Sequence, residues 1–412
     1  MNNLKYGQST TSIPEELLRK SRWLIPPDTL APLENEHEGI NMALRNPVGC
    51  KALSELVQPT DKIAIIVSDN TRPVPTYKLL PSILEELHCA GIEEQNITIV
   101  FALGIHRRMT TEEEIQVIGR EVVGKYKTVQ PMEYVFKGRT SRNTPIEVCR
   151  EVDEADFLIL TGNIEFHYFA GYSGGYKALM PGVSTRDAIQ NNHKMMLDPR
   201  AAIGCADGNP LREDIEEFGR QFPRTFLVNV VLNSDKEIIH VVAGDPILAH
   251  RSGCKVLDQC YKVAVPEFAD LVIVSAGGYP KDMNLYQAQK ALENAARVTK
   301  EGGKIVLVAE LREGFGEDIF EDWLMNSSTI DEIISKINEE FILGGHKAAA
   351  IAKLLKKHEV LLFSALHDDI GRKAFFTPLK DLYELTQGTF ECIYIIPYGN
   401  QTLPEVVCVN KG

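Results

Sequence analysis

The segment Ser68–Pro73 places three side chains that could take part in chemistry within four residues. Asp69 supplies a carboxylate, Thr71 a hydroxyl and Arg72 a guanidinium, directly after an apolar run typical of a strand. An arginine can hold a carboxylate or a phosphate through two parallel hydrogen bonds. The same composition also suits a capped helix start with a surface ion pair. The segment alone leaves both interpretations open.

Two histidines lie where imidazole could do chemistry. His106 follows a second apolar run, within Gly104–Thr110, and His193 ends the predicted helical stretch Asp187–His193. Imidazole exchanges protons near neutral pH and is the commonest metal-binding side chain. A lone histidine is more often structural or solvated, so neither residue identifies a site by itself.

The strongest local signal is the glycine-rich segment Gly162–Gly182, which contains His167 and Lys177. Glycines such as Gly174 and Gly175 let the backbone approach a ligand, and successive N–H groups can surround an anion. The segment is not a P-loop, because other residue types fill two positions that GxxxxGK[ST] requires. A generic glycine turn is the alternative, and a lysine among so many glycines favours a ligand site.

A fourth polar group lies in the second half of the chain. Tyr286, Gln287 and Lys290 follow Gly277–Pro280 at the start of a predicted helix. This spacing places Tyr286 and Lys290 one turn apart, with Gln287 beside Lys290. A phenol, an amide and an ammonium group could receive a carboxylate, although a solvated helix face has the same composition.

Strand-like runs alternate with amphipathic helical stretches, which predicts an α/β fold with largely parallel sheets covered on both faces. The predicted strands are 62–68, 96–104, 156–163, 225–233, 237–244, 271–278, 302–310, 360–366 and 392–399. The runs 225–233 and 237–244 are close enough to form a hairpin. Ligands bind such sheets outside the carboxyl ends of the strands, where the polar segments of the first half of the chain fall.

The alternation restarts near residues 262–270, and 412 residues exceed one ordinary core, so we expect two α/β domains with a substrate and cofactor cleft between them. The predicted N-terminal domain, 1–265, carries the cofactor and the acid/base residues. The predicted C-terminal domain, 266–390, contributes substrate-binding residues. The strands of 391–412 could join either domain.

The composition excludes several functional classes. The net charge of −13 argues against a nucleic-acid surface, which needs clustered lysine and arginine. No apolar run approaches the roughly 20 residues that span a bilayer, and the N-terminus lacks a secretory signal. The eight cysteines are scattered without a CxxC pair, so we expect free thiols. These features predict a cytoplasmic protein with no nucleic-acid or membrane partner.

Five ordered motifs resemble the nickel-pincer-nucleotide-dependent lactate racemase family. They are SDNTRP, ALGIHR, EFHYFAGYSGGYK with MPGV after it, NNH, and GGYPKDMNLYQAQK. The ten-residue step from His167 to Lys177, the sixteen-residue step from Lys177 to His193 and the YQxxK pattern also fit the family. The resemblance runs over most of the chain and implies a racemase or epimerase of a 2-hydroxy acid.

The resemblance also implies a cofactor. This is a nickel-pincer nucleotide, pyridinium-3,5-bisthiocarboxylic acid mononucleotide with nickel, joined to Lys177 through a thioamide. His193 resembles the protein ligand in a square-planar donor set that suits Ni(II). The other implied cofactor-binding residues are Asp69, Thr71, Gly174 and Gly175. Cofactor-biosynthesis proteins are the implied partners, and protein made without them is expected to be an apo form.

His106 and His167 resemble the acid/base pair of the family. Taking the C2 hydrogen of a 2-hydroxy acid as hydride avoids a carbanion that the ionised carboxylate stabilises poorly, and a base removes the hydroxyl proton as hydride leaves. Two histidines are needed because the enantiomers present their hydroxyls differently. The residues implied to bind the substrate are Arg72, Tyr286, Gln287 and Lys290.

One departure from the family concerns the substrate. Members acting on lactate have a tryptophan near the substrate in the second domain, and the comparable stretch here contains His346 and Lys347. The tryptophans of this chain are Trp23 and Trp323. A larger or more polar 2-hydroxy acid is therefore consistent with the sequence, and the roles of His346 and Lys347 stay open.

Two other functions also stay open. A non-catalytic carrier of the nickel cofactor would need Lys177 and His193 but not His106 and His167. A nickel-independent enzyme acting on a small phosphorylated substrate would use the glycine segment to bind phosphate. The presence of both histidines in matching motifs favours catalysis. We make no prediction of the oligomeric state.

Overall fold

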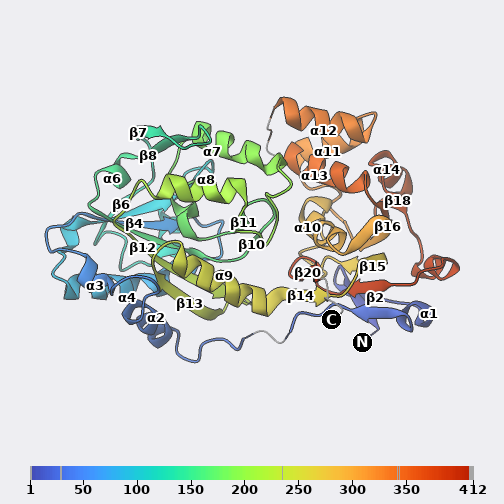
Figure 1. Ribbon diagram of the computed structural model, residues 1–412, viewed down its shortest axis with the longest axis horizontal. Helices are drawn as coiled ribbons and strands as arrows, with labels where there is room; N and C mark the ends of the chain where they lie inside the picture. The colour runs from blue at the N-terminus through green and yellow to red at the C-terminus, as the bar shows by residue number, and fades with distance from the viewer. Residues whose placement is uncertain (1, 28–29, 234, 341, 343, 408–412) are drawn as a thin grey trace. The chain divides into compact units, whose positions relative to one another are not determined.

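The computed structural model describes residues 2–27, 30–233, 235–340, 342 and 344–407. The chain forms two compact units, one of Thr29–Gln259 and the other of Met1–Asp28 with Cys260–Gly412. Each unit contains a six-stranded sheet with helices around it (Figure 1). The predicted α/β class with largely parallel sheets is confirmed.

The sheet of the Thr29–Gln259 unit has the strand order β13-β12-β9-β4-β5-β6. Its strands are β4 (Ile63–Ser68), β5 (Ile97–Ala102), β6 (Lys127–Val129), β9 (Phe157–Asn163), β12 (Thr225–Leu232) and β13 (Ile238–Gly244). Neighbouring strands are parallel except β12 and β13, which form the predicted antiparallel hairpin. The central strands are aliphatic throughout because both of their faces are buried.

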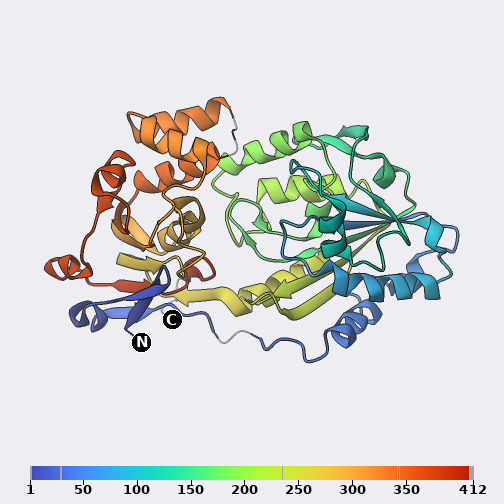
Figure 2. The same cartoon turned by 180° about the vertical axis from the view of Figure 1, so that it is seen from behind.

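Helices cover both faces of this sheet (Figures 1 and 2). Side chains of α2 and α4 pack on one face in a core with alternate strand residues such as Ile65 and Phe101. On the other face the 3-10 helix η2 packs against β9, β4 and α8. The helices are α2 (Glu36–Arg45), α3 (Leu53–Leu56), α4 (Thr76–Cys89), η1 (Glu94–Asn96), α5 (Thr111–Ile118), α6 (Arg150–Asp153), η2 (Gly175–Ala178), α7 (Arg186–His193), η3 (Lys194–Leu197), α8 (Pro210–Gly219) and α9 (Leu248–Tyr261).

Two short hairpins complete this unit. They are β7 (Tyr134–Arg139) with β8 (Pro145–Cys149), and β10 (Phe166–His167) with β11 (Gly171–Tyr172). The β10–β11 hairpin belongs to the glycine-rich segment. It folds that segment back on itself between β9 and η2.

The second unit contains an entirely parallel sheet of order β18-β17-β16-β15-β19-β3. Its strands are β3 (Ser21–Trp23), β15 (Ala269–Ser275), β16 (Thr299–Val308), β17 (Glu359–Phe363), β18 (Thr377–Pro378) and β19 (Ile393–Ile396). Its helices are α1 (Glu15–Leu18), α10 (Leu285–Ala296), α11 (Asp318–Asn326), α12 (Ile330–Glu339), α13 (Gly345–Leu355), α14 (Asp368–Lys373) and η4 (Leu382–Gln387).

The N-terminal segment corrects one predicted boundary. The range 1–265 assigned it to the first domain, whereas β3 pairs with β19 at the edge of the other sheet. The hairpin of β1 (Asn3–Tyr6) and β2 (Ser9–Ser12) also buries Leu4 in the core of that unit. A three-residue strand carries no periodicity that sequence can detect, which explains the error.

The C-terminal strands, whose membership was left open, lie in the same unit. β19 pairs with β15 inside the sheet. β20 (Leu403–Val406) pairs in parallel with β14 (Lys262–Val265). Cys408, one of the eight cysteines expected to be free thiols, lies outside the described residues.

Candidate active site

Three polar segments of the Thr29–Gln259 unit meet at one edge of its sheet. β4 is hydrogen-bonded on one side to β5 and on the other to β9, and all three strands are parallel. Their carboxyl ends therefore point to the same edge. The residues that follow them, 69–72, 103–106 and 164–178, form loops at that edge. The shared edge was predicted from the strand pattern alone.

Asp69 and His106 form the first functional pair. The imidazole Nδ1 lies 2.5 Å from Asp69 Oδ2, and the hydroxyl of Thr71 donates to Asp69 Oδ1 at 2.6 Å. Burial would raise the pKa of Asp69, but the hydrogen bonds from His106 and Thr71 outweigh it and the pKa is lowered. Because an ionised carboxylate only accepts, Nδ1 of His106 carries a proton, and in the neutral form of the ring Nε2 presents the lone pair. Asp69 and Thr71 were predicted to bind the cofactor, and nothing in the sequence indicated their contact with His106.

His167 has the opposite hydrogen-bond arrangement. Its Nδ1 accepts from the backbone N–H of Ala170 at 3.2 Å, so a neutral ring carries its proton on Nε2. Burial lowers the pKa of His167 well below its usual value, and the positive charges of Lys177, His193 and Arg212 lower it further. His167 is therefore a neutral hydrogen-bond donor at pH 7.

Lys177 lies on η2, at the end of the glycine-rich segment. Burial lowers the pKa of its amine well below the usual value, and the charges of Arg212 and Arg72 act in the same direction, against Glu165. An amine that loses its proton readily is a nucleophile, because the lone pair becomes available. The exposed Arg72 thus acts electrostatically on both Lys177 and His167.

His193 ends α7, and Phe169 lies between it and His167. The ring centroids of Phe169 and His193 are 4.9 Å apart, and those of Phe169 and His167 are 4.5 Å apart. The helix is fixed by Asn192, whose side chain donates to the carbonyl of Leu211 at 3.1 Å. Two imidazoles therefore share one aromatic neighbour beside the glycine-rich segment.

The glycines of this segment have a packing role that the sequence did not reveal. Gly174 and Gly175 adopt φ values of 71° and 63°, and a Cβ at Gly174 would lie 2.5 Å from the Asn229 side chain. The N–H of Gly175 donates to Asn229 Oδ1 at 2.9 Å. That N–H is therefore engaged by protein and is not available to an anion. Direct cofactor binding by the two glycines stays a prediction.

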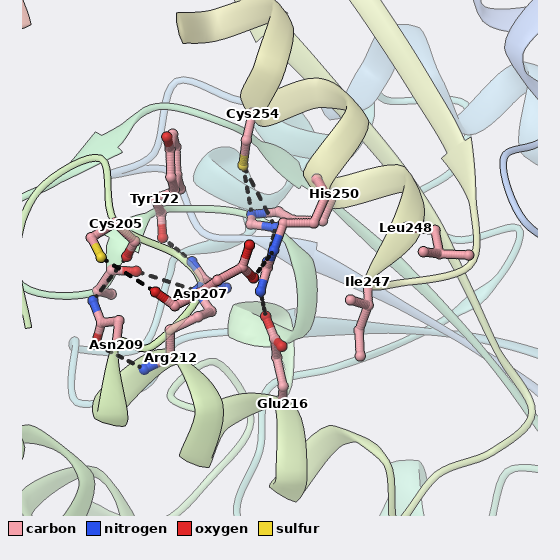
Figure 3. Close-up of polar contacts among 12 residues, drawn as sticks. Tyr172, Cys205, Asp207, Asn209, Arg212, Glu216, Ile247, Leu248, His250 and Cys254 are labelled. Atoms are coloured by element: carbon pink, nitrogen blue, oxygen red, sulfur yellow. Dashed lines mark hydrogen bonds and ion pairs between the residues drawn. The ribbon is translucent and has the colours of Figure 1, made fainter. Parts of the chain in front are cut away.

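Three buried polar side chains that the sequence analysis missed hold the segment in place. They are Arg212, Asn229 and His250, with exposed fractions of 0%, 0% and 1%. His250 donates from Nε2 to the carbonyl of Ser173 at 2.8 Å, close to Arg212 (Figure 3). Burial and then the charge of Arg212 lower the pKa of His250 well below its usual value, which keeps it neutral. No motif marks these residues, because each sits in an otherwise ordinary helix or strand.

The predicted substrate residues Tyr286, Gln287 and Lys290 lie on α10 of the other unit. Asn284 caps this helix by accepting from the Gln287 N–H at 3.0 Å. The Lys347 ammonium lies 3.7 Å from the centroid of the Tyr286 ring and donates to the Tyr286 carbonyl at 2.8 Å. The cluster on α10 is therefore supported by a second cation from α13.

The two open positions on α13 differ in their surroundings. His346 is buried, and its Nδ1 accepts from the N–H of Gly344 at 3.1 Å at the helix start. Lys347 has a pKa lowered to about 8 by burial, with Glu293 opposing and Lys290 reinforcing the shift. Trp323 packs against Gly345 and is only 6% exposed. His346 thus supports the helix start, whereas Lys347 belongs to the polar cluster.

The described residues contain no group of three or more His, Cys, Asp or Glu side chains able to hold a metal ion. Among the same residues, no helix is long and apolar enough to cross a bilayer.

Comparisons with known proteins agree with this architecture. Residues 6–204 match the lactate racemase N-terminal domain, and residues 265–387 match the lactate racemase C-terminal domain. Lactate racemase from Thermoanaerobacterium thermosaccharolyticum is 32% identical over 367 residues, 85% of this chain and 84% of that protein. Lactate racemase from Lactiplantibacillus plantarum is 34% identical over 345 residues, 81% of each chain.

Solved structures agree as well. The lactate racemase apoprotein of T. thermosaccharolyticum superimposes with a TM-score of 0.85 at 29% identity, covering 98% of this chain and 99% of that one. A Thermotoga maritima protein at 17% identity has a TM-score of 0.62, covers 93% and 100% of the two chains, and so shares the fold. Both domain models and both relatives lead to one assignment, which the motifs predicted: the chain belongs to the lactate racemase family, a family of isomerases.

Proposed function

We propose that this chain racemises lactate or a closely related 2-hydroxy acid, with a nickel-pincer nucleotide attached to Lys177 as its cofactor. The observation that carries the proposal is the cluster in the Thr29–Gln259 unit. A lysine with a lowered pKa lies there near His167, which His193 also influences electrostatically. His106, whose hydrogen-bond arrangement is opposite to that of His167, follows another strand of the same sheet. Lactate as substrate comes from the names of the relatives.

The residues present fit such a cofactor. A single imidazole, His193, suits a metal whose other donors arrive with an organic group, since three-residue metal clusters are missing from the described part of the chain. The amine of Lys177 is the nucleophile that a covalent tether requires. The matched structure is described as an apoprotein, which is consistent with a separable group in that relative. When bound, the nickel-pincer nucleotide would supply a reversible acceptor for the C2 hydrogen as hydride.

The protein's own residues would then manage charge and protons. His106, with its lone pair on Nε2, is set to accept the hydroxyl proton, and Asp69 stabilises the imidazolium that results. His167, with its proton on Nε2, is set to donate a hydrogen bond to the substrate oxygen. Arg72 and, from the other unit, Tyr286, Gln287 and Lys290 would orient the substrate carboxylate.

The first test concerns the covalent attachment of the cofactor to Lys177. The protein is co-expressed with the cofactor-biosynthesis proteins, and Lys177 is examined by intact-protein and peptide mass spectrometry together with nickel analysis. We expect one adduct on Lys177 and one nickel per chain, with Lys177→Ala as the matched control that gains neither. Unmodified Lys177 after successful co-expression would overturn the proposal and also exclude a nickel carrier.

Turnover then separates enzyme from carrier. Single enantiomers of lactate, malate, phenyllactate and sugar acids are incubated with loaded protein, and loss of optical rotation is followed. We expect His106→Ala and His167→Ala to keep the adduct and nearly abolish racemisation. A loaded protein that racemises none of these acids would favour the carrier. Activity in a host without the biosynthesis proteins would favour a nickel-independent enzyme.

A further inference from the structure

One buried guanidinium lies at the centre of the glycine-rich segment. Arg212, on α8, is fully buried and donates to the carbonyls of Ala170 at 3.2 Å and Gly174 at 3.3 Å, and also to that of Tyr172 (Figure 3). These three carbonyls come from alternate residues of one short loop. The loop is therefore wrapped around a single cation.

The charge of Arg212 is not neutralised by a direct ion pair. Within the described ranges no carboxylate lies in ion-pair contact with its guanidinium, and Glu216, on the same helix, pairs instead with Arg251 at 2.9 Å. Carbonyl dipoles offset part of the cost of burying a cation but leave its net charge in place. The hydrogen bonds to the three carbonyls account for the loop geometry, and the net charge that remains can act on neighbouring titratable groups.

The guanidinium and the backbone of Lys177 share one hydrogen-bond acceptor. The Gly174 carbonyl that accepts from Arg212 Nη1 also accepts from the Lys177 N–H, at 3.3 Å in both cases. Arg212 is also the strongest of the charges that lower the pKa of the Lys177 amine, ahead of Arg72, with Glu165 acting against them. The neighbouring imidazoles of His167 and His250 carry lowered pKa values and are neutral at pH 7.

We propose that Arg212 is a positioning residue for Lys177: it fixes the loop that carries the lysine and places a permanent positive charge beside the amine, so that Lys177 offers a lone pair for covalent modification. The proposal rests on the proposed function, in which Lys177 is the attachment point. The loop would then have two roles. Its glycines bring the backbone close to the guanidinium, and its lysine is the residue on which the positive charge acts.

The experiment uses unmodified full-length protein and trace labelling with acetic anhydride from pH 6 to 10. In this reaction the amine nitrogen bonds to an acetyl carbon, acetate leaves and the proton goes to the buffer. Peptide mass spectrometry gives the labelling of Lys177 relative to the exposed Lys255 in the same unit. We expect Lys177 to reach half-maximal reactivity at a clearly lower pH than Lys255.

Variants separate charge from loop geometry. Arg212→Met removes the charge, and we expect the Lys177 midpoint to rise by about one pH unit, a roughly tenfold loss of labelling near pH 7. Arg212→Lys keeps the charge, so the midpoint stays low while proteolysis of the loop increases. Arg251→Met, which removes a neighbouring cation that is paired to Glu216, should leave the midpoint unchanged.

Two results would overturn the inference: a wild-type midpoint equal to that of Lys255, or an unchanged midpoint in folded Arg212→Met. Should Arg212→Met fail to fold, the wild-type comparison and Arg212→Lys decide. Because the labelling needs no cofactor, its failure leaves the adduct test of the proposed function intact. A missing adduct in turn leaves the labelling result valid.

Discussion

Single hydrogen bonds determine what each imidazole of the active site can do. Asp69 accepts from Nδ1 of His106, whereas the backbone of Ala170 donates to Nδ1 of His167. The same side chain is thereby set as a proton acceptor in one position and as a donor in the other. The residue types suggested an acid/base pair. Which of the two histidines accepts a proton and which donates one depends on their hydrogen-bond partners, and the residue types do not reveal these.

The first prediction concerns Asp69→Asn. An amide at this position no longer fixes the proton on His106 Nδ1 or stabilises the imidazolium, so we expect kcat for racemisation to fall by about 10²-fold or more. Optical rotation measured from each enantiomer gives kcat. Mass spectrometry of the Lys177 adduct is the control, because loading should be unchanged. Full activity in the loaded variant would remove the assigned role of Asp69.

Glu293 lies on α10, on the same helix as the predicted substrate residues. Burial raises its pKa to about 7 despite Lys347, Lys290 and a hydrogen bond from Gln289. The unfolded carboxyl loses its proton near the ordinary glutamate pKa of 4.5, so the folded state holds one more proton between about pH 4.5 and 7. The stability that this group contributes therefore falls as pH rises through that window.

Glu293→Gln removes the titration. We expect the melting temperature of the variant, relative to wild type, to increase between pH 4.5 and 7.5, as measured by thermal denaturation followed through tryptophan fluorescence. The difference in melting temperature at any one pH also reflects the lost electrostatic interaction with Lys347. The change of that difference with pH is therefore the diagnostic quantity. A difference that is flat across this range would show that Glu293 titrates normally in the folded protein.

At the scale of elements, loop placement followed from the strand pattern, while loop conformation did not. The apolar runs of β4, β5 and β9 were recognisable because buried parallel strands are aliphatic on both faces, and their order along the chain placed the polar loops at one edge. Arg212 and His250 were not recognisable, because buried polar side chains in amphipathic helices look like their solvent-facing neighbours. Backbone conformation also sets where a helix ends: α5 ends at Ile118, and the next residue, Gly119, adopts a φ of 90°.

The packing of the glycine-rich segment can be tested by comparing Gly171 with Gly208. Gly171 and Gly208 both have a φ of 75°, but a Cβ at Gly171 would lie 2.0 Å from the Cys205 carbonyl oxygen, whereas one at Gly208 would meet nothing within 4 Å. We expect Gly208→Ala to cost about 1 kcal/mol for the left-handed backbone. Gly171→Ala should cost about 1–3 kcal/mol more from overpacking.

Urea denaturation followed by far-UV circular dichroism measures both losses. Since backbone conformation is matched, the difference between the two variants isolates the steric contact with Cys205. Equal losses would mean that the loop moves away freely, and the packing role assigned to its glycines would then be wrong.

At the scale of the whole molecule, the N-terminal segment belongs to the same unit as Cys260–Gly412. The carbonyl of Lys5 accepts from the Ser275 hydroxyl at 2.7 Å, and the N–H of Gly7 donates to Asp282 at 2.6 Å. These contacts hold the loop between β15 and α10, the helix of the predicted substrate residues. The N-terminal segment therefore supports the position of Tyr286, Gln287 and Lys290, although it is far from them in sequence.

A matched pair of core substitutions tests this assignment. Leu4 and Leu44 are both fully buried, Leu4 in the core of the unit with β15 to β17 and Leu44 in the core around β4. Both tryptophans, Trp23 and Trp323, belong to the unit of Leu4, so their fluorescence reports that unit. Leu→Ala at such sites costs about 2–5 kcal/mol. We expect Leu4→Ala to lower the tryptophan-detected unfolding transition, and Leu44→Ala to leave it nearly unchanged while increasing hydrogen exchange in β4 and β9. If Leu4→Ala instead accelerates exchange in β4 and β9 and leaves the fluorescence transition unchanged, the N-terminal segment stabilises the other unit. The predicted range 1–265 for the N-terminal domain would then be correct.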